Sequence, residues 1–471
     1  MIVCVVGSGG REHALARVLG RTADVVATPG NPGITGTTPE GHTLRSVDTP
    51  PEEVDADLYV IGPEAPLVDG LADRLRAAGK LVFGPGADGA RLEGSKAFMK
   101  EMLAEAGVPT ARFGAFSDVG EAVAFLRTLP GPWVVKTDGL AAGKGVLVTD
   151  SLAEAEADVV AKLSGSAFGE AGRRVVVEEG LTGPECSLLV LCDGRRLAPL
   201  APAQDFKRAD DGDRGPNTGG MGAFSPVPSV DDDLVARLVD EAVAPLVTAL
   251  RARGIDYRGV LYAGLMLTPE GPKVLEYNVR FGDPETQVVL PRFDGDLAAL
   301  LAEAAAGELR TVPRFVDDAA VCVVLASEGY PEAPRTGDVI EGLEAAGRVD
   351  GAVVFHAGTR YGAGTGAGPG GGGPGAGRGG GGPDGAGPTG ADATGGAGPG
   401  GGAGGTPPIE TAGGRVLGVT ALGGTIDEAR SRAYEAVALL GWPGMHHRTD
   451  IAAHVAGPRP AGVPPTQEVA P

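Results

Sequence analysis

The chain has 471 residues, with 61 acidic and 40 basic side chains and a net charge of −21. This length predicts about three domains, each long enough to bury a core. The charge argues against a nucleic-acid-binding protein, which needs clustered Lys and Arg to neutralise phosphates, but it leaves small phosphate ligands open.

Two further features bear on location. The four cysteines have neither Cys-x-x-Cys spacing nor a metal-ligand pattern, which predicts buried thiols in a reducing compartment. The first apolar run, 2–6, is too short for a signal peptide, and no run reaches the roughly 20 residues of a membrane span. The sequence therefore predicts a cytoplasmic protein without a nucleic-acid or membrane partner.

The amino-terminal segment alternates short apolar runs with helical periodicity, which predicts a doubly wound parallel sheet up to about residue 95. Helices are expected at 11–19, at 67–78 and at 96–106. Four runs are expected to be strands: 2–6, 25–27, 58–61 and 81–83.

A glycine turn, Gly7-Ser8-Gly9-Gly10, follows the first expected strand and opens a helix at Arg11. Free backbone N–H groups and the positive end of the helix favour an anion there. A dinucleotide-binding turn is one interpretation, but the third glycine and the acid after the second strand are missing. A phosphate-bearing substrate is the interpretation that we favour.

The second region contains a glycine-rich loop, Lys136–Val146, with a lysine at each end of its polar part. Strands are expected on both sides, at 133–136 and 145–148, so the loop could form a lid over nucleotide phosphates or a plain hairpin. It is not a Walker loop, because only three residues separate Gly139 from Gly143 and Gly145 replaces the hydroxyl residue after Lys144.

A helix is expected at 152–163, and a strand at 175–178 leads into a polar strand end. Glu178, Glu179 and Leu181 could present backbone groups to an adenine edge, and Glu185 could accept hydrogen bonds from ribose hydroxyls. An ordinary strand end is the alternative.

Strands are also expected at 186–191, 260–267 and 274–279, with a long amphipathic helix near 232–253. Between them lie two polar loops, Gln204–Arg208 and Gly215–Gly222, which are either plain surface or a close approach to a small ligand.

The stretch Leu275–Gln287 carries the clearest chemistry. Alternation along 274–279 places Glu276 and Asn278 on one face of a strand, with Arg280 on the same side. A carboxylate and an amide oxygen two residues apart can share magnesium with phosphate oxygens, and Arg280 provides a fork for phosphate. This pattern predicts a metal–phosphate site.

From residue 319 onward, strands at 320–325, 353–355 and 415–421 and a helix at 427–440 predict a small α+β domain. Residues 362–405 contain 25 glycines in 44 positions, which predicts a disordered insertion in a hairpin loop. The proline-rich tail, 456–471, is also expected to be disordered.

Taken in order, these motifs closely resemble the phosphoribosylamine–glycine ligase family (glycinamide ribonucleotide synthetases) of the ATP-grasp superfamily. The resemblance extends from Met1 to about Ile451, apart from the insertion. It rests on these runs: Gly7–His13, Gly62–Leu67, Leu92–Lys96, Lys136–Val146, Gln204–Arg208, Gly215–Gly222 and Leu275–Gln287.

The resemblance implies an α/β ATP-grasp architecture with five segments. These are an N-terminal doubly wound domain for the substrate (1–102), a grasp lid and small subdomain (103–190), a grasp core (191–325), a C-terminal α+β domain (326–455) and the tail. It also implies a monomer that uses ATP with Mg²⁺ or Mn²⁺ to join glycine to 5-phosphoribosylamine through a glycyl phosphate.

The resemblance assigns roles to individual residues. Catalytic roles fall on Arg280, Asp205 and Lys207, and metal binding falls on Glu276 and Asn278. Nucleotide binding falls on Lys96, Lys136, Gly143, Lys144, Glu178, Glu179, Leu181 and Glu185. Substrate binding falls on Gly9, Gly10, Arg11, Glu64, Asn217, Gly220 and Met221.

One departure is Phe206, which stands where many relatives have histidine. Two other functions are weighed: an ATP-grasp carboxylase that acts on bicarbonate, and a nucleotide-binding protein without catalysis. The Gly-Gly-Arg-Glu-His run and the Asn217–Gly222 loop favour the glycine ligase over the first, and intact Lys136, Glu276 and Asn278 speak against the second.

Overall fold

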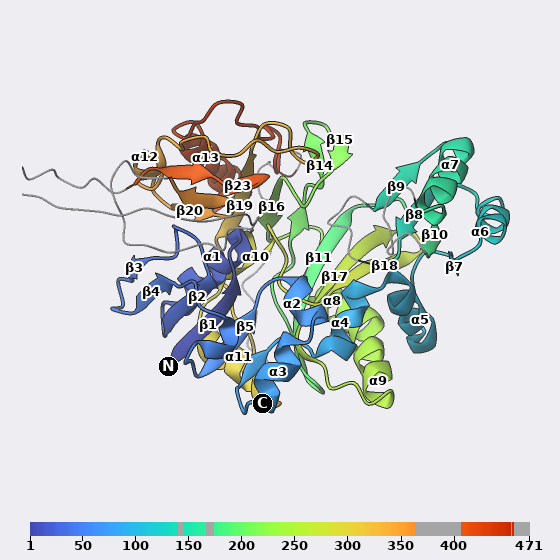
Figure 1. Ribbon diagram of the computed structural model, residues 1–471, viewed down its shortest axis with the longest axis horizontal. Helices are drawn as coiled ribbons and strands as arrows, with labels where there is room; N and C mark the ends of the chain where they lie inside the picture. Colours follow the sequence, from blue (N-terminus) through green and yellow to red (C-terminus); the bar gives the residue numbers. More distant parts are fainter. Residues whose placement is uncertain (140–144, 166–173, 363–406, 454, 456–471) are drawn as a thin grey trace, which may run out of the picture.

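A computed structural model describes residues 1–139, 145–165, 174–362, 407–453 and 455 (Figure 1). The expected insertion (except Gly362) and tail lie outside these residues, as do Gly143 and Lys144. In Figure 1 the amino-terminal region, in blue, lies beneath the orange and red carboxyl-terminal region, and a teal lobe with α6 and α7 extends to the right.

The amino-terminal region is built on a six-stranded sheet of order β3-β4-β2-β1-β5-β6. Apart from the antiparallel β3–β4 pair, its strands are parallel, and β1 lies between β2 and β5. The chain therefore leaves β1 first on one side and then on the other, so the end of β1 is the point where ligands collect in such sheets. The strands are β1 (Ile2–Gly7), β2 (Asp24–Pro29), β3 (Gly36–Thr37), β4 (Thr43–Ser46), β5 (Leu58–Ile61) and β6 (Val82–Phe83).

The prediction of one continuous helix at 67–78 was wrong. The segment contains two helices, α2 (Glu64–Val68) and α3 (Leu71–Ala77), because Gly70 adopts a left-handed conformation with φ of 78°. The other elements of this region are α1 (Gly10–Leu19), the 3₁₀ turn η1 (Pro51–Glu53), α4 (Ala87–Gly94) and α5 (Lys96–Ala106).

Two four-stranded antiparallel sheets follow, of order β7-β10-β8-β9 and β12-β11-β17-β18. Helices α6 and α7 pack on the first sheet, whose core contains Val135, Val159 and Val177. The elements are β7 (Phe113–Phe116), α6 (Val119–Leu126), β8 (Trp133–Thr137), β9 (Val146–Thr149), α7 (Leu152–Leu163), β10 (Val175–Glu179), β11 (Glu185–Asp193), β12 (Leu197–Pro199), β17 (Arg258–Thr268) and β18 (Gly271–Asn278).

The long helix expected near 232–253 contains a π-helical segment, η3 (Val239–Val243), between α8 (Asp232–Leu238) and α9 (Ala244–Ala252). Pro245 has no backbone N–H to donate to the preceding turn, so the regular helical hydrogen bonding is interrupted just before it.

The carboxyl-terminal sheet has the order β13-β16-β19-β23-β20, and its first two strands come from residues 204–225. Strand β11 crosses the expected segment boundary at position 190, and β19 crosses the one at position 325. The expected segment boundaries stay predictions. The elements are β13 (Gln204–Asp205), β14 (Arg208–Asp210), β15 (Arg214–Asn217), β16 (Gly222–Ser225), α10 (Thr286–Val289), η4 (Leu290–Arg292), α11 (Leu297–Ala306), β19 (Ala319–Ala326), α12 (Leu343–Ala346), β20 (Ala352–His356), β21 (Thr359–Tyr361), β22 (Ile409–Thr411), β23 (Arg415–Gly423) and α13 (Ile426–Val437).

The hairpin expected around the glycine-rich segment is confirmed, because β20 pairs with β23 and β21 pairs with β22. We expect that deleting Gly364–Gly404 leaves activity within about twofold and does not lower the melting temperature, because a shorter loop costs less entropy to close. Steady-state kinetics and thermal unfolding of the deletion variant check this. A large loss of turnover would instead give the insertion a function.

All four cysteines are buried thiols, as expected, and burial raises the pKa of each to about 12. In the described residues, no helix has the length and apolar composition needed to cross a membrane.

Two buried histidines join the amino-terminal and carboxyl-terminal regions. The His356 backbone N–H donates to Nδ1 of His13 at 2.9 Å, and Asn31 Nδ2 donates to the His356 carbonyl at 2.9 Å. Burial lowers the pKa of His356 to about 4, and burial together with the charges of His356 and Arg17 lowers the pKa of His13 well below 6.5.

Acid is therefore expected to destabilise the fold. An unfolded histidine titrates near pH 6.5, so each buried histidine stabilises the fold fully above that pH, and this contribution is lost as pH falls toward the folded pKa. For His356 the loss between about pH 7.5 and pH 5 is about 2 kcal/mol. Urea unfolding at both pH values should show a smaller loss in His356→Gln than in the wild type, and equal losses would contradict the assignment.

Candidate active site

Glu276, on β18, is surrounded by cations from several elements. Burial by itself would raise the pKa of its carboxyl, but Lys207, Lys136, Lys96 and Arg280 together lower it below the ordinary value. Lys136, on β8, also donates to the Leu275 carbonyl at 3.3 Å, which joins the two four-stranded sheets at this point. The structure thus brings together four of the predicted site residues around an ionised Glu276.

Glu178 forms ion pairs with two lysines inside the protein. Its carboxylate lies 2.9 Å from Nζ of Lys136 and 3.0 Å from Nζ of Lys100, and all three side chains are buried. Because β10 pairs with strands on both sides, the backbone of Glu178 belongs to the sheet. The residue assigned to nucleotide binding therefore acts on Lys136 through its side chain.

Lys100 is a residue that sequence reasoning missed. It donates to Thr110 Oγ1 at 2.7 Å, and burial lowers its pKa to about 8 although Glu178 opposes that shift. An apolar helix face carrying one lysine could have signalled it, but its partner lies 78 positions away in sequence.

Lys96 is fixed at the start of α5. Its Nζ donates to the Gly139 carbonyl at 2.9 Å, while Oδ1 of Asp138 accepts from Ser95 Oγ at 3.0 Å and from the Ala97 N–H at 3.2 Å. These contacts attach the beginning of the glycine-rich loop to Lys96. The loop's Gly143 and Lys144 lie outside the described residues.

Lys207 pairs with Glu185 rather than standing alone. The distance from Nζ to Oε2 is 2.7 Å, so the residue assigned to ribose recognition and a residue assigned to catalysis share one ion pair. Burial by itself would lower the pKa of Lys207, but the carboxylates of Asp205 and Glu185 raise it well above its ordinary value.

Asp205 is a buried carboxyl next to this pair. Burial raises its pKa to about 8, Lys207 opposes the shift, and the nearby Glu285 adds to it. Its Oδ1 has no hydrogen-bond partner within the described part of the chain. Glu285 itself accepts from Tyr262 at 2.9 Å and Ser187 at 3.2 Å, a network that sequence reasoning also missed.

Glu276 and Asn278 provide two hard oxygen donors on one strand. No cluster of three or more His, Cys, Asp or Glu suited to a metal ion occurs among the described residues. This set fits Mg²⁺, which commonly takes one or two protein oxygens and completes its shell with phosphate and water. It does not fit a metal held entirely by protein ligands.

Arg280 is held by two carboxylates of the amino-terminal half. Its Nη2 lies 2.7 Å from Glu93 Oε1, its Nε lies 3.4 Å from Glu64 Oε2, and Nη2 is 3.4 Å from Asn278 Oδ1. Glu93 was not among the predicted site residues. The arginine is therefore preorganised between the metal-capable strand and Glu64.

The glycine turn lies directly against the segment that follows Arg280. Arg11 donates to the Phe281 carbonyl at 3.2 Å, and Oε2 of Glu12 accepts from the Gly9 N–H at 2.6 Å. A β-carbon added to Gly10 would lie 2.6 Å from Nε2 of Gln287, closer than real contacts allow. A larger residue at position 10 would therefore displace the end of the Gln287 side chain.

The loop that contains Asn217, Gly220 and Met221 approaches the same segment. Gly220 has φ of 110°, and a β-carbon there would lie 2.5 Å from Cδ of Pro284. Met221 is fully buried, and its N–H donates to the Phe206 carbonyl at 2.7 Å. Asn217 pairs with Arg208 in the β14–β15 ribbon.

The strand end assigned to adenine is partly occupied by the protein's own hydrogen bonds. The Glu179 N–H donates to the Arg112 carbonyl at 3.0 Å, and its Oε1 accepts from the Arg112 N–H at 2.9 Å. Leu181 follows Gly180, whose N–H donates to the Pro132 carbonyl at 2.6 Å. A backbone contact from Glu179 to adenine would have to use its carbonyl.

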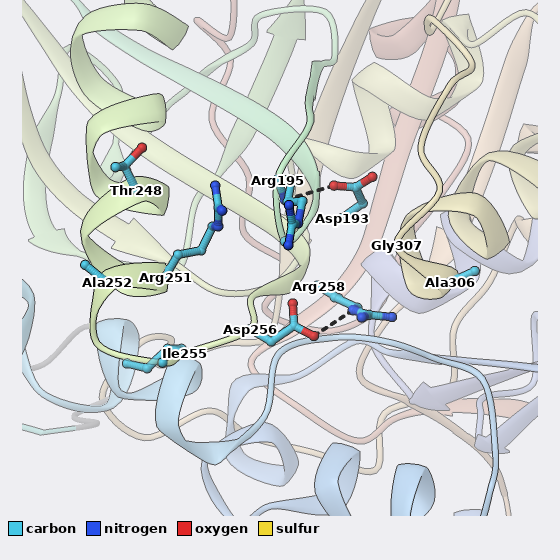
Figure 2. A pocket seen from close by; sticks show the side chains of 12 residues that line it. Asp193, Arg195, Thr248, Arg251, Ala252, Ile255, Asp256, Arg258, Ala306 and Gly307 are labelled. Atoms are coloured by element: carbon cyan, nitrogen blue, oxygen red, sulfur yellow. Dashed lines mark hydrogen bonds and ion pairs between the residues drawn. The ribbon is translucent and has the colours of Figure 1, made fainter.

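A groove of about 650 Å³ lies apart from these residues, and none of the predicted site residues lines it. Figure 2 shows Arg195 and Arg251 in this groove and the ion pair of Arg258 with Asp256, at 2.9 Å. None of the lysines that lower the pKa of Glu276 (Lys96, Lys136 and Lys207, here called the lysine cluster) lines this groove.

Three family models together match most of the chain. They are described as phosphoribosylglycinamide synthetase N domain (residues 1–93), ATP-grasp (A) domain (94–286) and C domain (320–372 and 396–454). The phosphoribosylamine–glycine ligase of Streptomyces coelicolor is 47% identical and covers 97% of this chain and 100% of its own. The chain belongs to the phosphoribosylglycinamide synthetase family.

Solved structures agree with this membership. A crystal structure of phosphoribosylamine–glycine ligase from Thermotoga maritima matches with a TM-score of 0.74 and 32% identity, covering 96% of this chain and all of its own. A biotin carboxylase–β,γ-ATP complex from Campylobacter jejuni matches with a TM-score of 0.62 and 11% identity, covering 95% and 92%, which shows likeness of fold alone. The ATP-grasp architecture predicted from the sequence is confirmed.

Proposed function

We propose that this chain is an ATP-dependent phosphoribosylamine–glycine ligase in purine biosynthesis. Family membership supports the reaction, and one structural observation carries its assignment to this site. The segment 275–287 accepts a hydrogen bond from Lys136 at one end, where lysines also lower the pKa of Glu276, and lies against the Gly9–Arg11 turn further along. A phosphoryl-transfer site and an anion-binding turn are thereby joined by a single stretch of chain.

The reaction proceeds in two displacements. A carboxylate oxygen of glycine attacks the γ-phosphorus of ATP and ADP leaves, which gives glycyl phosphate. The amine of 5-phosphoribosylamine then attacks the acyl carbon, phosphate leaves, and the nitrogen loses a proton. Each step develops negative charge on phosphate oxygens, so prearranged cations lower both barriers.

The chain's own side chains divide these tasks. The ATP phosphates are held by Lys96 and Lys136, together with Gly143 and Lys144, which lie outside the described residues. The nucleoside side is formed by Glu179, Leu181 and Glu185. Glu178 keeps Lys136 oriented. Lys207 and Arg280 neutralise the acyl phosphate, and Asp205, with an unpartnered oxygen, accepts from the ammonium group of glycine.

The turn of Gly9, Gly10 and Arg11 binds the phosphoribosylamine phosphate, next to Glu64, while Asn217, Gly220 and Met221 form the facing loop. Glu276 and Asn278 would hold Mg²⁺, or Mn²⁺ in its place, and the metal when bound would neutralise phosphate charge. We also propose that the enzyme is a cytoplasmic monomer. Light scattering of the purified protein tests the oligomeric state.

An assay of substrate dependence tests the proposal. ATP consumption and formation of an amide product are measured with glycine plus 5-phosphoribosylamine, generated from ribose 5-phosphate and ammonia, and separately with bicarbonate. Turnover that requires both glycine and the phosphoribosylamine is expected. Turnover with bicarbonate alone would favour the carboxylase alternative, and nucleotide binding without any turnover would favour the non-catalytic one.

A further inference from the structure

We propose that Arg415, at the start of β23, is a positioning residue that holds the Asn217–Gly222 loop against Asp283. The proposal rests on the proposed function, because it assigns the resulting surface to 5-phosphoribosylamine. Arg415 lies in the carboxyl-terminal region, far in sequence from every motif that suggested the site.

The guanidinium of Arg415 contacts two segments at once. Its Nη1 donates to the carbonyl oxygens of Asp283 at 2.7 Å and of Gly220 at 3.4 Å, and also to that of Gly219. Its Nη2 lies 3.2 Å from Oδ2 of Asp283. A planar fork with several fixed donors can serve a carboxylate and backbone carbonyls together.

A second contact from the same region holds the loop. The Gly219 N–H donates to the hydroxyl of Tyr330 at 3.0 Å, and the Gly219 carbonyl accepts from Arg415. Both backbone groups of Gly219 are therefore bound by side chains of the carboxyl-terminal region. A β-carbon on Gly219 would lie 3.0 Å from Cζ of Arg415. The arginine therefore packs directly onto the backbone of the loop.

Asp283 extends this contact to the amino-terminal turn. Its Oδ1 accepts from Gln287 Nε2 at 2.7 Å, and Gln287 lies against Gly10. A β-carbon on Gly9 would lie 3.5 Å from Oδ2 of Asp283. Asp283 thus lies between Arg415 on one side and the phosphate-binding turn on the other.

The charge of Arg415 is needed at this position. Burial would raise the pKa of Asp283, but Arg415 first and Arg11 second lower it below its ordinary value. Without Arg415, a buried carboxylate would remain with less compensation and would lie beside a substrate that carries phosphate. Both effects weaken binding at the turn, whereas the lysine cluster that serves ATP is unchanged.

The test compares Arg415→Ala with the wild type and with Arg432→Ala. Arg432 is a matched control because it also lies in the carboxyl-terminal region and donates to a backbone carbonyl, that of Leu422, at 2.7 Å. In Arg415→Ala we expect the KM for 5-phosphoribosylamine to rise between about tenfold and a hundredfold, the size of a lost charged hydrogen bond. The KM for ATP should stay within about twofold.

Hydrogen exchange of the peptide that covers residues 215–224 tests the clamp without any activity measurement. Exchange should accelerate at least about tenfold in Arg415→Ala and stay unchanged in Arg432→Ala. If Arg415→Ala does not fold, Tyr330→Phe removes the acceptor of the Gly219 N–H and should shift both readouts in the same direction by a smaller factor.

The outcomes separate the two proposals. A wild-type protein without turnover overturns the proposed function, while the exchange data still decide whether Arg415 holds the loop. Unchanged exchange in Arg415→Ala overturns the clamp. Faster exchange with an unchanged KM for 5-phosphoribosylamine overturns the positioning role. A KM for ATP that rises as much as the KM for 5-phosphoribosylamine indicates general disruption and overturns the positioning role as well.

Discussion

Replacing Glu276 by alanine is expected to lower kcat by about 1,000-fold while the protein stays folded, the size of effect seen when a prearranged charge is removed from a transition state. Glu276 is the only carboxylate proposed as a metal ligand, and four cations already hold it ionised. Without it, Asn278 alone cannot keep a divalent cation beside the ATP phosphates. The loss should therefore fall on the chemical step.

The measurement combines steady-state kinetics with calorimetric titration of ATP in the presence and absence of Mg²⁺. In Glu276→Ala the advantage that Mg²⁺ gives to ATP binding should largely disappear, whereas metal-free ATP binds no more weakly than to the wild type. Glu270→Ala is the control, since Glu270 lies in the turn between the same two strands, where it contacts Thr268 and lies 3.9 Å from Lys273. A Glu276→Ala enzyme with normal turnover would refute the metal assignment.

The second large effect is expected for Lys136→Met, which should lower kcat/KM for ATP between about 100-fold and 1,000-fold. Lys136 contributes a charge next to Glu276 and connects the two sheets through the Leu275 carbonyl. Methionine keeps the length and the apolar stem of the side chain, so what is lost is the charge that faces the phosphates.

Lys100→Met provides a matched control for stability. Both lysines pair with the buried Glu178, at 2.9 Å for Lys136 and 3.0 Å for Lys100, so each substitution leaves this carboxylate with one partner. Both variants should melt at lower temperature, because removal of one charge from a buried pair is costly. Only Lys136→Met should lose affinity for ATP, and an equal loss in both variants would make Lys136 a structural residue.

Local sequence was sufficient for many of the longer elements. The helix expected at 96–106 is α5 and that at 152–163 is α7, since a serine N-cap begins each and the apolar spacing is helical throughout. The helix at 67–78 failed at Gly70, because a glycine inside an apolar pattern can either continue a helix or break it. That choice depends on packing around α2 and α3.

The partners of site residues were harder to predict than the residues themselves. Glu276, Asn278 and Lys136 were predicted from strand alternation and a glycine-rich loop, whereas Glu93 and Arg415 were not predicted and the signal for Lys100 was only an apolar helix face. Glu93 and Lys100 stand among other charged residues of α4 and α5, and Arg415 is the one charge of β23. Their importance arises from a partner 78 to 187 positions away.

By itself, the sequence predicted many of the longer strands and helices, because periodicity and turn residues are properties of neighbouring positions, and its motifs carried the family resemblance that implied the reaction. Tertiary structure alone decided that Glu178 holds two lysines, that Arg280 lies between Glu64 and Glu93, and that β13 and β16 join the carboxyl-terminal sheet. Burial makes the difference: charges removed from water must find partners wherever the chain places them, and those partners are set by the packing of distant segments.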